Sequence, residues 1–112
     1  MSSFSNLSTG RIKVEGSPSF TNLGTPSAPS TYTATASSSE AVAVNANRKG
    51  LVVINLGTVN VSFGCGVTAV VNSGITLLPN GTWVMDQFTF TTAAINAVAA
   101  TGTSVLSIQE YV

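Results

Sequence analysis

The sequence predicts an all-β protein, a small β-sandwich of jelly-roll type with about seven to eight strands and an extended N-terminal arm. Ser and Thr make up 30 of the 112 residues, and the branched Cβ of Thr favours strands. From residue 40 onward, short apolar runs are separated by turn residues at intervals of about 8–12 residues, which is typical of sandwiches and barrels. We therefore divide the chain into an arm, residues 1–39, and a sandwich, residues 40–112.

The predicted arm has the composition of an extended segment. Residues 16–39 contain no charged residue and three of the four prolines of the chain. Such a segment is either a flexible linker or an arm laid across a partner, and the short "RIKVE" run within 1–39 alternates as an edge strand does. Large apolar side chains recur along the segment, which favours the arm. These are candidate partner contacts: Phe4, Leu7, Phe20, Leu23 and Tyr32.

The strands of the sandwich are expected where short apolar runs occur. They cover residues 40–45, 51–56, 59–63, 75–78, 82–86, 95–99 and 103–111. The stretches "NLGTVN" and "LPNGT" predict tight hairpin turns, because Gly and the Asn-Gly pair adopt the backbone conformations that such turns need. The alanines of residues 91–102 favour a helix, but this segment is short and ends at a glycine, so we expect a strand or a single turn there.

The charge of the chain argues against several classes of partner. Only 7% of the residues are charged, and the net charge is zero, so neither nucleic acid nor an anionic membrane is attracted electrostatically. No apolar run is long enough for a transmembrane helix, and the first residues lack the pattern of a signal peptide. A single cysteine fits a reducing cytosol. Because low net charge promotes association and the predicted core is small, we expect a homo-oligomer.

No group of residues in the sequence matches a catalytic or metal site. The stretch "GCGVTA" resembles a dinucleotide-binding fingerprint, but the helix that this fingerprint needs does not follow. Cys65 has no histidine to act as its base, and one Cys with four scattered acids does not form a metal-ligand set. Asp86 and Glu110 could in principle approach each other as a glycosidase pair, but acids at strand ends are usually solvated caps. We expect no enzymatic activity, no cofactor and no metal.

Four further residues have two interpretations each. Arg48 and Lys49 form the only basic cluster, which is either a solvated turn or a salt bridge at a subunit or partner contact, so both are candidate contact residues. Trp83 and Tyr111 lie in predicted strands. Lone aromatic residues in strands are more often core or interface residues than sugar-stacking platforms.

Three stretches of the sandwich resemble a small β-domain of tailed-bacteriophage virion proteins: "NANRKGLVVINLGTVNVSFG", "GITLLPNGTWVMD" and "INAVAATGTSVLSIQEYV". In that pattern an Asn-x-x-Arg-Lys turn leads into an apolar strand ending in Asn, and a hairpin then ends in Phe-Gly. An aromatic-containing strand, an Ile-x-Ala-Ile-like strand and a final alternating strand follow. The resemblance covers about residues 41–112, and the arm has no counterpart in it. The matching positions are Asn45, Arg48, Lys49, Asn55, Phe63, Gly64, Trp83, Ile95, Ala97 and Val98.

The resemblance implies a structural role in the virion, either as a capsid decoration (cement) protein or as a module of a head or tail fibre. It implies the major capsid protein as partner, a homotrimer, and a location on the capsid surface after synthesis in the bacterial host cytoplasm. The resemblance does not choose between head and tail. One domain with an arm favours decoration, because a fibre normally carries much more chain. The alternative is a fibre module that binds a host receptor or glycan through Trp83 or Tyr111.

Overall fold

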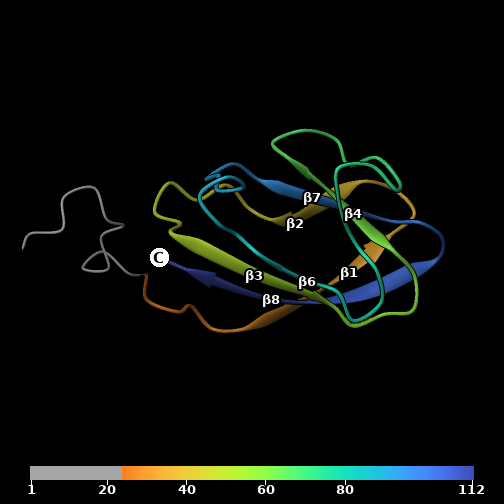
Figure 1. The fold of residues 1–112 in the computed structure, drawn as a ribbon, viewed down its shortest axis with the longest axis horizontal. Helices are drawn as coiled ribbons and strands as arrows, with labels where there is room; N and C mark the ends of the chain where they lie inside the picture. Colours follow the sequence, from red (N-terminus) through yellow and green to blue (C-terminus); the bar gives the residue numbers. More distant parts are fainter. Residues whose placement is uncertain (1–23) are drawn as a thin grey trace, which may run out of the picture.

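The computed structural model describes residues 24–112, and in this part of the chain all regular structure is β (Figure 1). Four candidate contact residues, Phe4, Leu7, Phe20 and Leu23, and the "RIKVE" run lie outside the described residues. Among the described residues there is no helix long and apolar enough to cross a membrane. The strands are β1 (Ser30–Thr35), β2 (Ser39–Val42), β3 (Gly50–Asn55), β4 (Val61–Cys65), β5 (Ile75–Leu77), β6 (Thr82–Val84), β7 (Ile95–Ala99) and β8 (Thr103–Tyr111).

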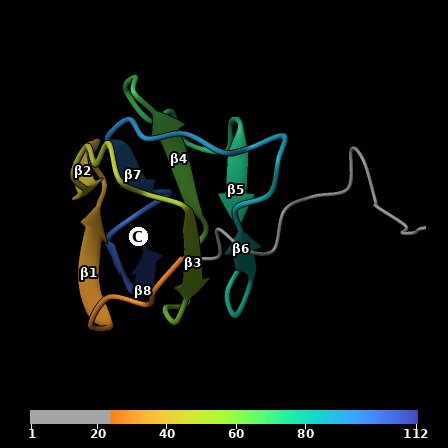
Figure 2. The same ribbon diagram turned by 90° about the vertical axis from the view of Figure 1, so that its left-hand side faces the viewer.

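The strands form two four-stranded sheets, with the orders β1-β8-β3-β6 and β2-β7-β4-β5. All paired neighbours are antiparallel, and the first strand pairs with the last, the second with the seventh, the third with the sixth and the fourth with the fifth. This nested pairing is the strand order of an eight-stranded jelly roll. Figure 2 shows the two sheets as facing layers. The predicted fold class, a small all-β sandwich, is confirmed.

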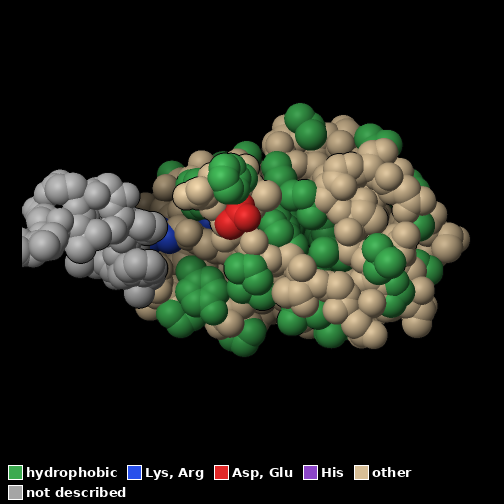
Figure 3. Space-filling model, in the orientation of Figure 1, with side chains coloured by type: hydrophobic (Ala, Val, Ile, Leu, Met, Phe, Trp, Pro, Cys, Tyr) green, Lys and Arg blue, Asp and Glu red, His purple; other side chains and the backbone are tan. Residues whose placement is uncertain are grey.

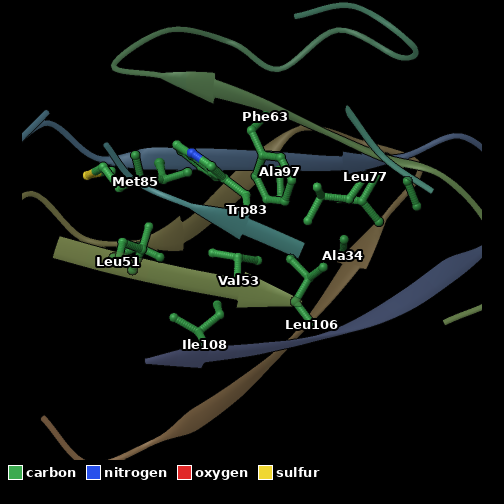
Figure 4. Close-up of a cluster of buried hydrophobic side chains, with 14 residues drawn as sticks. Ala34, Leu51, Val53, Phe63, Leu77, Trp83, Met85, Ala97, Leu106 and Ile108 are labelled. Atoms are coloured by element: carbon green, nitrogen blue, oxygen red, sulfur yellow. The ribbon is translucent and has the colours of Figure 1, made fainter. Parts of the chain in front are cut away.

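The core lies between the sheets and follows from the period-two alternation of the strands. In β3, for example, Leu51 and Val53 point inward and are each 1% exposed. The rings of Phe63 and Trp83 come from opposite sheets and pack with their centroids 5.5 Å apart (Figure 4). The other core side chains are Ala34, Val42, Val61, Leu77, Met85, Ile95, Ala97, Ala99, Leu106 and Ile108.

Both hairpin predictions were wrong. "NLGTVN" joins β3 to β4 and "LPNGT" joins β5 to β6, and in each case the two strands belong to different sheets. The turn residues correctly mark where the chain reverses: Asn80, for instance, has a positive φ of 67°. They do not determine whether the next strand pairs with the previous one or crosses to the opposite layer. The strand expected at residues 95–99 is present as β7.

The sandwich begins earlier than the boundary expected at residue 40. Strand β1 lies within the predicted arm, yet it pairs with β8 along six residues. Its alternation places Ala34, fully buried, in the core. Tyr32, a candidate partner contact, packs against the same core, and its hydroxyl group hydrogen-bonds to Oγ of Ser39. The segment between residues 30 and 39 is therefore part of the sandwich.

One end of the sandwich is closed by Asn55, whose side chain is completely buried. Its amide nitrogen donates to the carbonyls of Val59 and Leu77 at 2.8 and 3.0 Å. Its amide oxygen accepts from the backbone N–H of Gly57 at 3.0 Å and from the hydroxyl of Ser104 at 2.6 Å. Both donors and both acceptor positions of the amide are used. Asn55 thus joins the β3–β4 turn to the end of β5 and the start of β8.

Candidate interaction surface

The other end of the sandwich brings together both ends of the described chain and two long connections, and we call it the terminal end (Figure 1). The β2–β3 connection, residues 43–49, contacts the β6–β7 connection, residues 85–94, through a hydrogen bond from Asn45 N–H to the carbonyl of Thr92 at 2.9 Å. Backbone hydrogen bonds also join residue 25 to residue 112. The segment before residue 24 therefore leaves the sandwich at the terminal end.

Arg48 holds the terminal end together from inside. Its side chain has no exposed surface, and its Nε donates to Oε2 of Glu110 at 2.6 Å, forming a salt bridge. Nη1 donates to the carbonyls of Thr91 at 2.9 Å and Ala93 at 2.8 Å, and Nη2 donates to the carbonyl of Ala43 at 2.6 Å. Four of the five guanidinium donors are used. The planar guanidinium thereby joins β8 to both connections, which a lysine cannot do.

These contacts decide between the two interpretations of the basic cluster. Arg48 is neither a solvated turn residue nor available as a surface contact, because its partners all lie within its own chain. Lys49 is exposed, and only its backbone N–H is anchored, by the carbonyl of Tyr111 at 2.7 Å. Of the two basic candidates, Lys49 is the one that remains at the surface.

Three large apolar side chains project from the two connections that Arg48 holds, and we call them the terminal patch. Phe88 is 85% exposed, Val44 68% and Phe90 46%. Figure 3 shows hydrophobic side chains standing over the β6–β7 connection next to an acidic side chain. Sequence reasoning did not single out these residues. The signal was "DQFTFTT", which places two aromatic residues in a short polar run between strands.

The backbone that carries Phe88 is fixed by a tight turn. Oδ1 of Asp86 accepts the N–H groups of Phe88 and Thr89 at 2.9 and 3.0 Å and the hydroxyl of Thr89 at 3.1 Å. These hydrogen bonds hold the pKa of the Asp86 carboxyl below its ordinary value, and the bond from the Phe88 N–H has the largest effect. The same Thr89 hydroxyl accepts the indole N–H of the buried Trp83 at 3.4 Å. The turn is therefore connected to the core.

Cys65 and the glycine-rich stretch around it, which resembled a nucleophile and a nucleotide-binding turn, have structural roles. Burial raises the pKa of the Cys65 thiol, and the nearby Arg48 charge only partly opposes this, so the thiol is protonated at neutral pH. Gly64 of the glycine-rich stretch lies against the backbone of the β4–β5 connection: an added Cβ would overlap the carbonyl of Val67 and lie 2.8 Å from the N of Ala69. No helix follows it in the described chain.

The residues considered for catalysis or for sugar stacking do not form a common site. Asp86 is engaged in its own turn and Glu110 in the salt bridge with Arg48, so the two acids have different partners, and Glu110 is not the solvated cap expected from the sequence. Trp83 is only 6% exposed and belongs to the core, and Tyr111 is half-buried at the end of β8. Within residues 24–112 no three side chains of the His, Cys, Asp and Glu types come together as a metal site does.

Comparisons with protein-family models, with curated proteins and with solved structures found no match for this chain.

Proposed function

We propose that this protein is a decoration (cement) protein of a tailed-bacteriophage capsid, which binds the major capsid protein on the outer surface of the assembled head as a homotrimer. The observation that carries the proposal is the character of its surface. Eleven large hydrophobic side chains are exposed among the described residues, while the whole chain has only eight charged residues, four of each sign. A surface of this kind is suited to burial against other proteins.

Two further features support the proposal. The stretch from Asn45 to Gly64 and the two later stretches resemble the β-domain of phage virion proteins. The sandwich is also small, and assembly with other subunits is a common way for small domains to gain stability.

The physical mechanism is mass action. A protein that binds only the assembled shell stabilises it by RT ln(1 + [L]/Kd), which is about 2.7 kcal/mol per site when the free protein is at 100 times its Kd. Many copies on one head add these increments. No chemical step is involved, and no cofactor is needed.

The alternative, a fibre module that binds a glycan, receives less support from the structure. One of its two stacking platforms, Trp83, is a core residue packed against Phe63. A buried indole ring has no free face to offer a sugar. We therefore favour decoration.

The test adds the full-length chain to purified heads that lack it. The expected result is saturable binding, with a copy number that scales with the capsomers of the head, and heads that withstand a higher temperature. Absence of binding, or a copy number confined to the tail or to fibres, would overturn the proposal. A full-length variant with Ser at positions Phe4, Leu7, Phe20 and Leu23 tests the contribution of the arm, and sedimentation of the free protein tests the trimer.

A further inference from the structure

We infer that the terminal patch, Val44, Phe88 and Phe90, is the face of the sandwich that docks on the shell, into an uncharged apolar recess of the major capsid protein. This inference rests on the proposed function and adds the orientation of the sandwich. Val44, Phe88 and Phe90 lie outside the three stretches that resemble phage virion proteins, and none of them is a partner contact expected from the sequence.

The first reason is that the patch is pre-organised. Phe88 stands on a turn in which Oδ1 of Asp86 accepts three hydrogen bonds, one from Phe88 and two from Thr89. The next residues of the same connection are fixed by the guanidinium of Arg48, which binds the carbonyls of Thr91 and Ala93. An aromatic side chain on a rigid backbone loses little conformational entropy on binding, and such residues are common anchors of protein interfaces.

The second reason is that both connections are held as one unit. Arg48 also binds the carbonyl of Ala43, next to Val44, and the N–H of Asn45 binds the carbonyl of Thr92. Val44 and the two phenylalanines therefore project from loops that are fixed to each other. A single protein surface can contact all three without rearranging the loops.

The third reason concerns the occupant. The 23 residues before Gly24 join the sandwich at this end, and they contain the apolar residues expected to contact the shell, among them Phe4, Leu7 and Phe20. A tether bound to the shell raises the effective concentration there most strongly for the end from which it leaves, which is the end that carries the patch. The opposite end, with the exposed Leu56 and Leu78, faces away.

The absence of charge on the patch side chains indicates what kind of partner surface they fit. None of the three patch side chains is charged, and the two exposed charged residues of the connections, Lys49 and Asp86, have opposite signs. Electrostatic attraction therefore contributes little, and the partner surface is expected to be apolar and uncharged. Binding is expected to depend only weakly on salt concentration.

The experiment compares two double variants of the full-length chain for binding to purified heads. One changes Val44→Ser and Phe88→Ser at the terminal end. The matched control changes Leu56→Ser and Leu78→Ser, which are 55% and 62% exposed at the opposite end. All four side chains project mainly into solvent, so both variants are expected to fold, and their thermal unfolding is measured alongside.

The terminal variant is expected to bind at least about tenfold more weakly than the wild type, and the control within about twofold. Equal binding by both variants, with the wild type bound normally, would overturn the orientation alone. No binding by the wild type would overturn the proposed function and the orientation together. If the terminal substitutions instead abolish self-association of the free protein, the patch contacts a second copy, and the assignment to the shell is wrong.

Discussion

At the residue scale, two buried polar side chains flank strand β3 and organise opposite ends of the molecule. Arg48 precedes the strand and binds three backbone carbonyls and Glu110. Asn55 ends the strand and uses all its hydrogen-bonding positions on neighbouring turns. Buried polar groups are tolerated when they are fully satisfied. Each of the two residues therefore has a structural role within the sandwich.

Replacing Arg48 with Met is expected to lower the free energy of unfolding by about 3–5 kcal/mol, because three carbonyls lose their donor and Glu110 loses its partner. Arg48→Lys keeps the charge but is expected to recover only part of this, since an ammonium group cannot reproduce the planar set of contacts. The measurement is urea unfolding at neutral pH. Lys49→Met, the exposed neighbour, is the control and should change stability by no more than about 0.5 kcal/mol. Equal effects at the two positions would contradict the role of Arg48.

The Asp86 turn gives a prediction for pH. Because the folded-state pKa of Asp86 lies below its ordinary value of 3.8, the turn contributes stability above about pH 4 and loses it as the pH falls through the folded-state pKa. Asp86→Asn removes this titration, so the variant should lose less stability than the wild type between about pH 5 and pH 2. Thermal unfolding across this range makes the comparison. If the stability of the variant and of the wild type fell equally steeply with decreasing pH, the turn would not depend on the carboxylate.

At the scale of elements, the β4–β5 connection, residues 66–74, shows how a loop is fixed to a sheet. The backbone N–H of Ala69 donates to Oγ of Ser38 at 2.9 Å, and the side-chain amide of Asn96 donates to the carbonyl of Val67 at 2.7 Å. The loop therefore crosses the outer face of the β2-β7-β4-β5 sheet. Its close approach to β4 requires the absence of a side chain at Gly64.

Gly64→Ala is expected to push this loop away from the sheet and to lower the free energy of unfolding by about 1–3 kcal/mol through overpacking. Limited proteolysis should then cut residues 66–74 faster than in the wild type. The matched control is Gly50→Ala, where an added Cβ would lie 3.7 Å from Cβ of Tyr111, an ordinary contact. If both variants behaved alike, the close approach at Gly64 would not be what holds the loop.

At the scale of the whole molecule, β1 completes the sandwich. Its pairing with β8 continues beyond the strand, through a bridge between Pro26 and Tyr111 and through hydrogen bonds that join residue 25 to residue 112. Without β1, strand β8 would become an open edge and Leu106 would lose Tyr32, the residue opposite it on β1. The free energy of unfolding of a domain this small is low, so the loss of one strand is a large fraction of it.

A chain that starts at Gly24 is therefore expected to unfold cooperatively, whereas a chain that starts at residue 40 is not, because it lacks β1. Near-ultraviolet circular dichroism during heating distinguishes the two, since it reports fixed aromatic packing such as that of Phe63 against Trp83. A chain from residue 40 with the full cooperative transition would show that β1 is an accessory rather than part of the sandwich.

The sequence by itself determined the fold class and the approximate positions of seven strands, because alternation of apolar residues and turn composition are local properties of the chain. Only the tertiary structure decided which strand pairs with which, that β1 belongs to the sandwich, and that two predicted hairpins cross between sheets. It also decided that Arg48 is buried while Phe88 is exposed. The physical reason is distance along the chain: Arg48 and Glu110 are 62 positions apart. Whether a side chain is covered depends on such partners, which no local pattern contains.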